Sequence, residues 1–115
     1  MEKKFELKQS VNQTVVEPED LLDYPMLTAY DDCMSPRIIK GDILAYDEAT
    51  IDDVEDGKVY IIYIDADPLI KRVYQTNDAD KYRLVSDNPE YQDITIDKAK
   101  VKRLYRVVGC IRVWE

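Results

Sequence analysis

Hydrophobic and polar residues alternate along this chain with a period of two more clearly than with a helical period. Residues 58–64, 69–74 and 82–86 are rich in β-branched and aromatic side chains, which is typical of strands. Turn-forming residues at 65–68 and 76–80 separate these segments, so consecutive strands are expected to form hairpins. The pattern therefore predicts a mainly β fold.

Shorter segments extend this prediction. Residues 43–46 and 94–96 predict short strands, and residues 103–114 predict one long strand or a strand pair, with Gly109 at a bulge or bend. No amphipathic helix of 12 or more residues is indicated. Helical signal is limited to two single turns, at residues 35–39 and 50–54.

The first 30 residues differ from the rest, because they contain no glycine and their strand signal is confined to residues 4–7. We predict that residues 1–30 form a leading arm or linker that packs on a body formed by residues 31–115. A chain of 115 residues is long enough for one domain with a core that needs no disulfide or metal.

The charge is acidic overall and unevenly distributed. With 16 basic and 24 acidic residues the net charge is −8, but residues 97–115 carry six basic and two acidic residues, a local +4, which leaves −12 for residues 1–96. We interpret the basic segment as a solvated strand face. Because an acidic body repels a phosphate backbone, we expect no DNA contact by this domain alone.

Several function classes are disfavoured by composition. The chain has no histidine and two cysteines, so we expect no metal, no cofactor and no disulfide framework, although one bridge between the cysteines is possible. It has no apolar stretch of membrane-spanning length and no signal-peptide pattern at its N-terminus, so we expect a cytoplasmic protein without a membrane anchor.

The most informative motif is Asp-Asp-Cys-Met-Ser-Pro-Arg-Ile-Ile-Lys-Gly-Asp at residues 31–42. It resembles the nucleophile segment Gly-Asp-Ser-Met-x-Pro-x-Ile-x-x-Gly-Asp of the LexA-like (S24) peptidases, which are related to signal peptidases and occur in phage-type repressors and UmuD-like proteins. Two positions depart from it: Asp31 replaces glycine, and Cys33 replaces the nucleophilic serine. The matching residues are Asp32, Met34, Pro36, Ile38, Gly41 and Asp42.

Three further segments support this resemblance, which spans residues 31–114. Residues 70–73 (Ile-Lys-Arg-Val) resemble the lysine strand, 84–91 resemble a Leu-x-Ser-x-Asn-Pro-x-Tyr segment, and 108–114 resemble a terminal Gly-x-Val-x-Trp strand. The resemblance implies the LexA and signal-peptidase β-fold, a β-clip or barrel-like body of short antiparallel strands with one or two short helical turns.

The resemblance also implies a catalytic dyad. Cys33 takes the nucleophile position, Lys71, 38 residues further on, takes the general-base position, and the backbone N–H groups of Met34 and Cys33 would bind an oxyanion. A buried lysine loses its proton because a low dielectric disfavours the ammonium, and the neutral amine then accepts a proton from the nucleophile.

The residues alone leave the state of this dyad open. Cys33 is a working nucleophile, an impaired one, or a small buried apolar residue, and carboxylates at Asp31, Asp32 or Asp42 would oppose a thiolate if they lay close. Lys71 either points inward or lies on a solvated face. Among the other residues, we discount Ser35 as a nucleophile, place Cys110 in a core strand, and assign Tyr91 and Trp114 to packing.

The Ala-Gly or Cys-Gly dipeptide at which repressors of this family cut themselves is absent from the chain, and so is a helix-turn-helix pattern. Either the cleavage site precedes residue 1 in a longer protein, or self-cleavage has been lost.

Three functions remain. The first is a regulatory and dimerisation domain of a repressor-like transcriptional regulator with weak or no peptidase activity, a homodimer that reaches DNA only through a separate N-terminal domain. The second is an active Cys–Lys self-cleaving peptidase of the SOS or phage-repressor type. The third is a non-catalytic β-rich interaction module. The lack of a membrane anchor argues against a signal peptidase.

Overall fold

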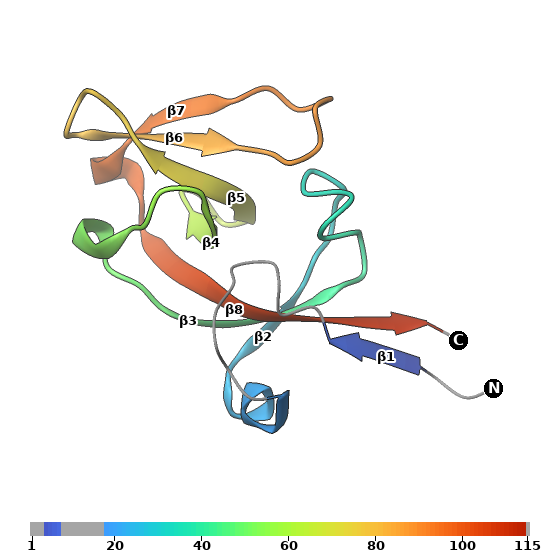
Figure 1. Ribbon diagram of the computed structural model, residues 1–115. Helices are drawn as coiled ribbons and strands as arrows, with labels where there is room; N and C mark the ends of the chain where they lie inside the picture. Colours follow the sequence, from blue (N-terminus) through green and yellow to red (C-terminus); the bar gives the residue numbers. More distant parts are fainter. Residues whose placement is uncertain (1–3, 8–17, 115) are drawn as a thin grey trace.

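The computed structural model describes residues 4–7 and 18–114, which form eight strands in one antiparallel sheet (Figure 1). The order in the sheet is β2-β3-β8-β4-β5-β6-β7, and β1 pairs with β8. Three short 3-10 helices, η2 (Pro18–Asp23), η3 (Ile51–Asp53) and η4 (Lys98–Lys100), connect the strands. The strands are β1 (Lys4–Leu7), β2 (Met26–Thr28), β3 (Ile43–Glu48), β4 (Lys58–Tyr63), β5 (Pro68–Gln75), β6 (Lys81–Val85), β7 (Ile94–Asp97) and β8 (Arg103–Trp114).

The long strand β8 organises the sheet, because it pairs with β1, β3 and β4. Its pairing with β3 shifts by one residue: Ala45 lies opposite Gly109 and Tyr46 opposite Val107, so Val108 is the extra residue of a β-bulge. A Cβ atom on Gly109 would lie 2.6 Å from Leu21 Cδ2, so the glycine allows η2 to pack closely on β8.

Among the described residues, two larger clusters of buried side chains form most of the core, and a third, smaller one contains Leu21, Ala45 and Val108. The first contains Cys33, Met34, Ile38, Ile61 and Ile70 together with Ala29, Leu44, Val59, Val107 and Cys110. The second is built from Val54, Tyr60, Ile62, Val73, Tyr82, Leu84 and Leu104. Residues of β4 and β5 contribute to both clusters, because successive side chains of a strand point to opposite faces.

The predicted strands are confirmed, and residues 103–114 form a single strand with the bulge beside Gly109. Residues 50–54 hold η3, whereas residues 35–39 lie in a turn without a helical segment. The sequence pattern missed β2 and the helices η2 and η4. These elements have three to six residues, which is too short for a period to be recognised.

The predicted leading arm is only partly described. Within residues 1–30, β1 and β2 belong to the same sheet as the body, and the path of residues 8–17 lies outside the described residues. The division at residue 31 therefore stays a prediction. The side chain of Trp114, which we assigned to packing, also lies outside the described residues.

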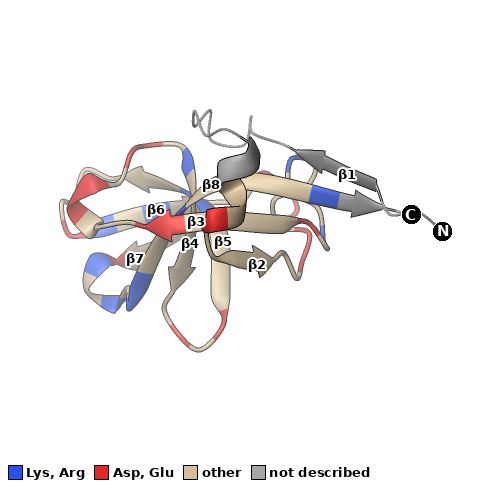
Figure 2. Ribbon diagram, turned by 90° about the horizontal axis from the view of Figure 1, so that it is seen from below, with Lys and Arg blue, Asp and Glu red and all other residues tan. Residues whose placement is uncertain are grey.

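The basic C-terminal segment is only in part a solvated face. Lysine and arginine residues are frequent near β7 (Figure 2), and Lys98 and Lys100 of η4 follow this strand in the sequence. Arg112 instead donates two hydrogen bonds to Asp42, whose side chain is 1% exposed. Among the described residues, no helix is both long and apolar enough to pass through a lipid bilayer.

Candidate functional site

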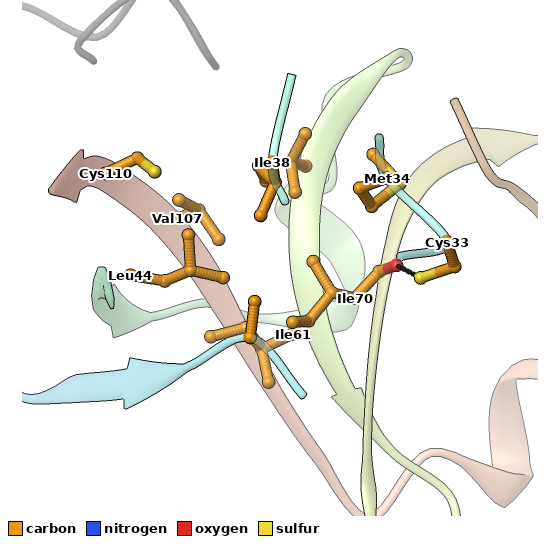
Figure 3. Packing of buried hydrophobic residues seen from close by; sticks show 10 residues of the cluster. Cys33, Met34, Ile38, Leu44, Ile61, Ile70, Val107 and Cys110 are labelled. Carbon is orange, nitrogen blue, oxygen red and sulfur yellow. Dashed lines mark hydrogen bonds between the residues drawn. The ribbon is translucent and has the colours of Figure 1, made fainter. Parts of the chain in front are cut away.

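The segment that carries Cys33 is a compact turn between β2 and β3. The Ser35 N–H donates to the Asp32 carbonyl at 3.0 Å, and the Ile38 N–H donates to the Met34 carbonyl at 3.0 Å. Met34 and Ile38 are each 1% exposed and pack in the first core cluster (Figure 3). The alternation of polar and apolar residues in the motif thus anchors the turn to the sheet and fixes the position of Cys33.

The Cys33 side chain is buried and already engaged. It is 3% exposed, and its thiol donates to the Ile70 carbonyl of β5, with 3.3 Å between Sγ and O (Figure 3). Burial raises the pKa of the thiol to about 12, the Asp31 carboxylate adds to this rise, and the Lys71 ammonium opposes it. Only about one molecule in ten thousand would carry a thiolate at pH 8.

The backbone N–H of Cys33 is also occupied. It donates to Asp31 Oδ1 at 3.1 Å, so this N–H, one of the two oxyanion donors that the family resemblance implies, is bound to a carboxylate. Met34 stays the predicted second donor of this oxyanion site, and its Sδ atom accepts the Asp87 N–H at 3.4 Å. Asp31 stands at the glycine position of the motif, so this contact follows from one of the two departures.

Lys71 points inward, which decides between the two orientations that the sequence left open. It shares a face of β5 with Leu69 and Val73, which pack in the second core cluster, and it is 5% exposed. Its Nζ atom donates to Ser86 Oγ at 2.6 Å. The β5–β6 register, Arg72 opposite Val85, places the next residue pair, Lys71 and Ser86, directly opposite one another.

The segment after β6 holds the Cys33 turn from the other side. The Asn88 N–H donates to the Cys33 carbonyl at 3.0 Å, and Asn88 Nδ2 donates to the Asp32 carbonyl at 3.1 Å. The Tyr91 hydroxyl donates to Asp32 Oδ1 at 2.6 Å, and the Tyr91 ring centroid lies 5.2 Å from Lys71 Nζ. The contact with Asp32 raises the pKa of Tyr91 to about 12.

Two ion pairs fix the segments of the site to the sheet. Arg72 makes a bidentate contact with Asp87 at 2.7 and 3.1 Å, which ties β5 to the segment that follows Ser86. At the other end of the Cys33 turn, Asp42 binds Arg112 of β8 with two contacts of 2.9 Å. Burial raises the pKa of Asp42, but the Arg112 guanidinium and the Ile39 N–H outweigh this effect and lower it overall.

The residues selected from the sequence converge, and two others join them. The Cys33 thiol contacts the carbonyl of Ile70, the residue before Lys71 in β5, so the two dyad positions are neighbours in the structure. Ser86 lies in one of the quoted motifs, but no role was assigned to it. The pairing register of β5 and β6 identifies it as the partner of Lys71. Tyr91, which we assigned to packing, is 37% exposed, and its ring packs beside Lys71.

The two cysteines do not form the bridge that the sequence permitted. Both are free and buried, and they lie at opposite ends of the first core cluster (Figure 3). Cys110 is 0% exposed within β8, which confirms its assignment to a core strand.

The fold and site together define a small β-sheet domain in which a turn carries a buried thiol into the vicinity of a buried strand lysine. A model of the Peptidase S24-like family matches residues 2–112 of the 115-residue chain. The chain therefore belongs to the Peptidase S24-like family. No curated protein is similar enough to count as a match.

The arrangement defines what the site can do in its resting form. A thiol whose pKa is about 12 is a weak nucleophile at neutral pH, because the thiolate is the reactive species. Lys71 directs a hydrogen bond to Ser86, and Asp31 occupies the N–H group of Cys33. Nucleophilic attack by Cys33 would require the thiol to leave the Ile70 carbonyl and to lose its proton.

Proposed function

We propose that this chain is a regulatory and dimerisation domain of a repressor-like transcriptional regulator, with a substituted dyad site that is weakly active or inactive. The observation that carries the second part is the double engagement of Cys33. Its thiol donates to the Ile70 carbonyl, and its N–H donates to the Asp31 carboxylate. The first contact holds the protonated nucleophile, and the second blocks a donor that would stabilise an oxyanion.

The two departures from the family motif both disfavour an active nucleophile. Cysteine replaces serine at residue 33, and the thiol is buried with a pKa of about 12. Aspartate replaces glycine at residue 31, where its carboxylate raises that pKa further and accepts the Cys33 N–H. A functional nucleophile needs the opposite surroundings, with nearby positive charge and free N–H donors.

Dimerisation is supported by the shape of the sheet. Strand β1 and the last residues of β8 form a ribbon that projects from the body (Figure 1). Among the described strands β1 pairs only with β8, and in the proposed dimer the other edge of β1 pairs with a second copy. In such a dimer, contact with DNA would be made by a separate N-terminal domain, because the described body is acidic.

Two measurements test this function. Sedimentation velocity over a wide concentration range is expected to show a dimer, and a strictly monomeric chain at high concentration would contradict the proposal. Because the chain lacks an Ala-Gly or Cys-Gly dipeptide, it is incubated with a peptide that contains Ala-Gly, and the masses of chain and peptide are expected to stay unchanged over days at raised pH. Cleavage of the peptide or of the chain that Lys71→Ala abolishes would refute the loss of activity.

An active Cys–Lys self-cleaving peptidase is the second candidate. It is favoured by the effect of the Lys71 charge, which lowers the Cys33 pKa against burial. The variant Asp31→Gly restores the family residue, frees the Cys33 N–H and removes a carboxylate that raises the thiol pKa. If the second candidate is right, Asp31→Gly accelerates cleavage of an already active chain. If the first is right, the intact mass of the original chain does not change.

The third candidate, a β-rich module without a catalytic origin, loses support because the chain belongs to a peptidase-like family.

A further inference from the structure

An exposed aromatic side chain lies against the buried lysine of the dyad site. Cys33 and Lys71 are 3% and 5% exposed, whereas Tyr91 is 37% exposed. The Tyr91 ring centroid lies 5.2 Å from Lys71 Nζ. The ring of Tyr91 therefore lies between the lysine and the surface of the molecule on this side.

The ring is fixed at its outer end by a single side-chain contact. The Tyr91 hydroxyl donates to Asp32 Oδ1 at 2.6 Å, and Asp32 is the residue before Cys33. The two segments are also joined by contacts that involve the backbone, from Asn88 to the Cys33 and Asp32 carbonyls. Loss of the Tyr91–Asp32 contact would therefore release the ring while the two segments stay joined.

We propose that Tyr91 is a movable cover of the dyad site, and that its hydrogen bond to Asp32 keeps the cover closed. Rotation of the ring away from Lys71 opens a path to the lysine and the thiol without unfolding the sheet. The fraction of open molecules limits how fast any reagent or ligand reaches Cys33. This inference rests on the proposed function, because it explains how the same site stays quiescent in the free chain.

The two cysteines allow a direct test in the intact chain. Alkylation by iodoacetamide at fixed pH is followed at both cysteines by peptide mass spectrometry. Cys110 is 0% exposed and serves as an internal reporter of global unfolding. Tyr91→Phe, which removes only the hydroxyl, is expected to raise the Cys33 rate roughly tenfold or more, as set by the loss of one hydrogen bond to a carboxylate, and to leave Cys110 unchanged.

Variants of the acceptor test whether the contact itself is responsible. Asp32→Ala is expected to raise the Cys33 rate by a similar factor, and the double variant with Tyr91→Phe is expected to add nothing more, because both remove the same bond. Asp32→Asn keeps an acceptor oxygen and is expected to stay near the original rate. The charged groups that shift the Cys33 pKa are Asp31 and Lys71, so these changes at Asp32 report on the cover.

The matched control is Tyr74→Phe. The Tyr74 ring lies 5.0 Å from the Arg83 guanidinium and packs against Gly57, and the described part of the chain shows no contact of it with Asp32 or Lys71. An unchanged Cys33 rate in Tyr74→Phe is expected. The cover is refuted if Tyr91→Phe leaves the Cys33 rate unchanged, if Cys110 accelerates in parallel, or if the double variant is fully additive.

Failure of this inference differs from failure of the proposed function. Self-cleavage of the chain would refute the proposed loss of activity, whatever the labelling shows. Identical Cys33 labelling in the original chain and in Tyr91→Phe would refute the cover and leave the intact-mass result untouched.

Discussion

Replacement of Lys71 by methionine is expected to stabilise the fold. Lys71 is 5% exposed, and its ammonium donates to the neutral Ser86 hydroxyl at 2.6 Å; within the described chain it forms no ion pair with a carboxylate. Burial of an ammonium costs several kcal/mol. One hydrogen bond to a charged group returns only about 1.5–3 kcal/mol. Methionine keeps the length of the side chain, so Lys71→Met is expected to raise the free energy of unfolding by about 1–2 kcal/mol.

Urea denaturation measures this change, and the neighbouring residue provides a matched control. Arg72 lies next to Lys71 on β5 but contacts Asp87 at 2.7 and 3.1 Å. Arg72→Met removes both close contacts of a partly buried carboxylate and leaves Asp87 only the 3.9 Å contact with the exposed Arg37, so it is expected to cost about 2–4 kcal/mol. The reasoning would be refuted if Lys71→Met destabilised the chain as much as Arg72→Met. A stabilised Lys71→Met variant would show that the lysine is retained at a cost in stability, as expected for a residue inherited with a catalytic site.

Three further predictions follow from the same contacts. The alkylation rate of Cys33 is expected to rise about tenfold per pH unit between pH 7 and 10 without a plateau, because its pKa is about 12; in urea the rate should level off near pH ~8.5. Asp42→Asn is expected to cost about 3 kcal/mol at neutral pH, because it breaks the buried pair with Arg112. Folding lowers the pKa of Asp42, so its contribution to the free energy of unfolding is present above the unfolded pKa of about 3.9 and is lost as the pH falls through the folded pKa. The free energy of unfolding of Asp42→Asn should therefore fall less steeply with acid pH than that of the original chain. Gly109→Ala is expected to lower the free energy of unfolding by about 1–3 kcal/mol, because the new methyl group would clash with Leu21. In a Leu21→Ala background, thermal unfolding should show a much smaller loss of stability.

The sequence by itself determined the strands and the identity of the dyad positions. A strand of six or more residues shows its alternation directly, which is why β4, β5 and β8 were predicted from the pattern. The motif spacing then selected Cys33 and Lys71, and the match of the Peptidase S24-like family over residues 2–112 supports the family assignment behind that choice.

Only the tertiary structure decided how these residues are surrounded. The residues that flank Lys71 in the sequence did not determine its face, whereas in the structure the lysine is 5% exposed and contacts Ser86 and the Tyr91 ring. Ser86 became its partner through the β5–β6 register, which depends on long-range pairing. The contact of Asp31 with the Cys33 N–H depends on the geometry of the turn, and the cover by Tyr91 depends on the distant segment after β6. Whether a nucleophile is activated or quiescent is set by charges and donors within a few ångströms, and only packing brings them there.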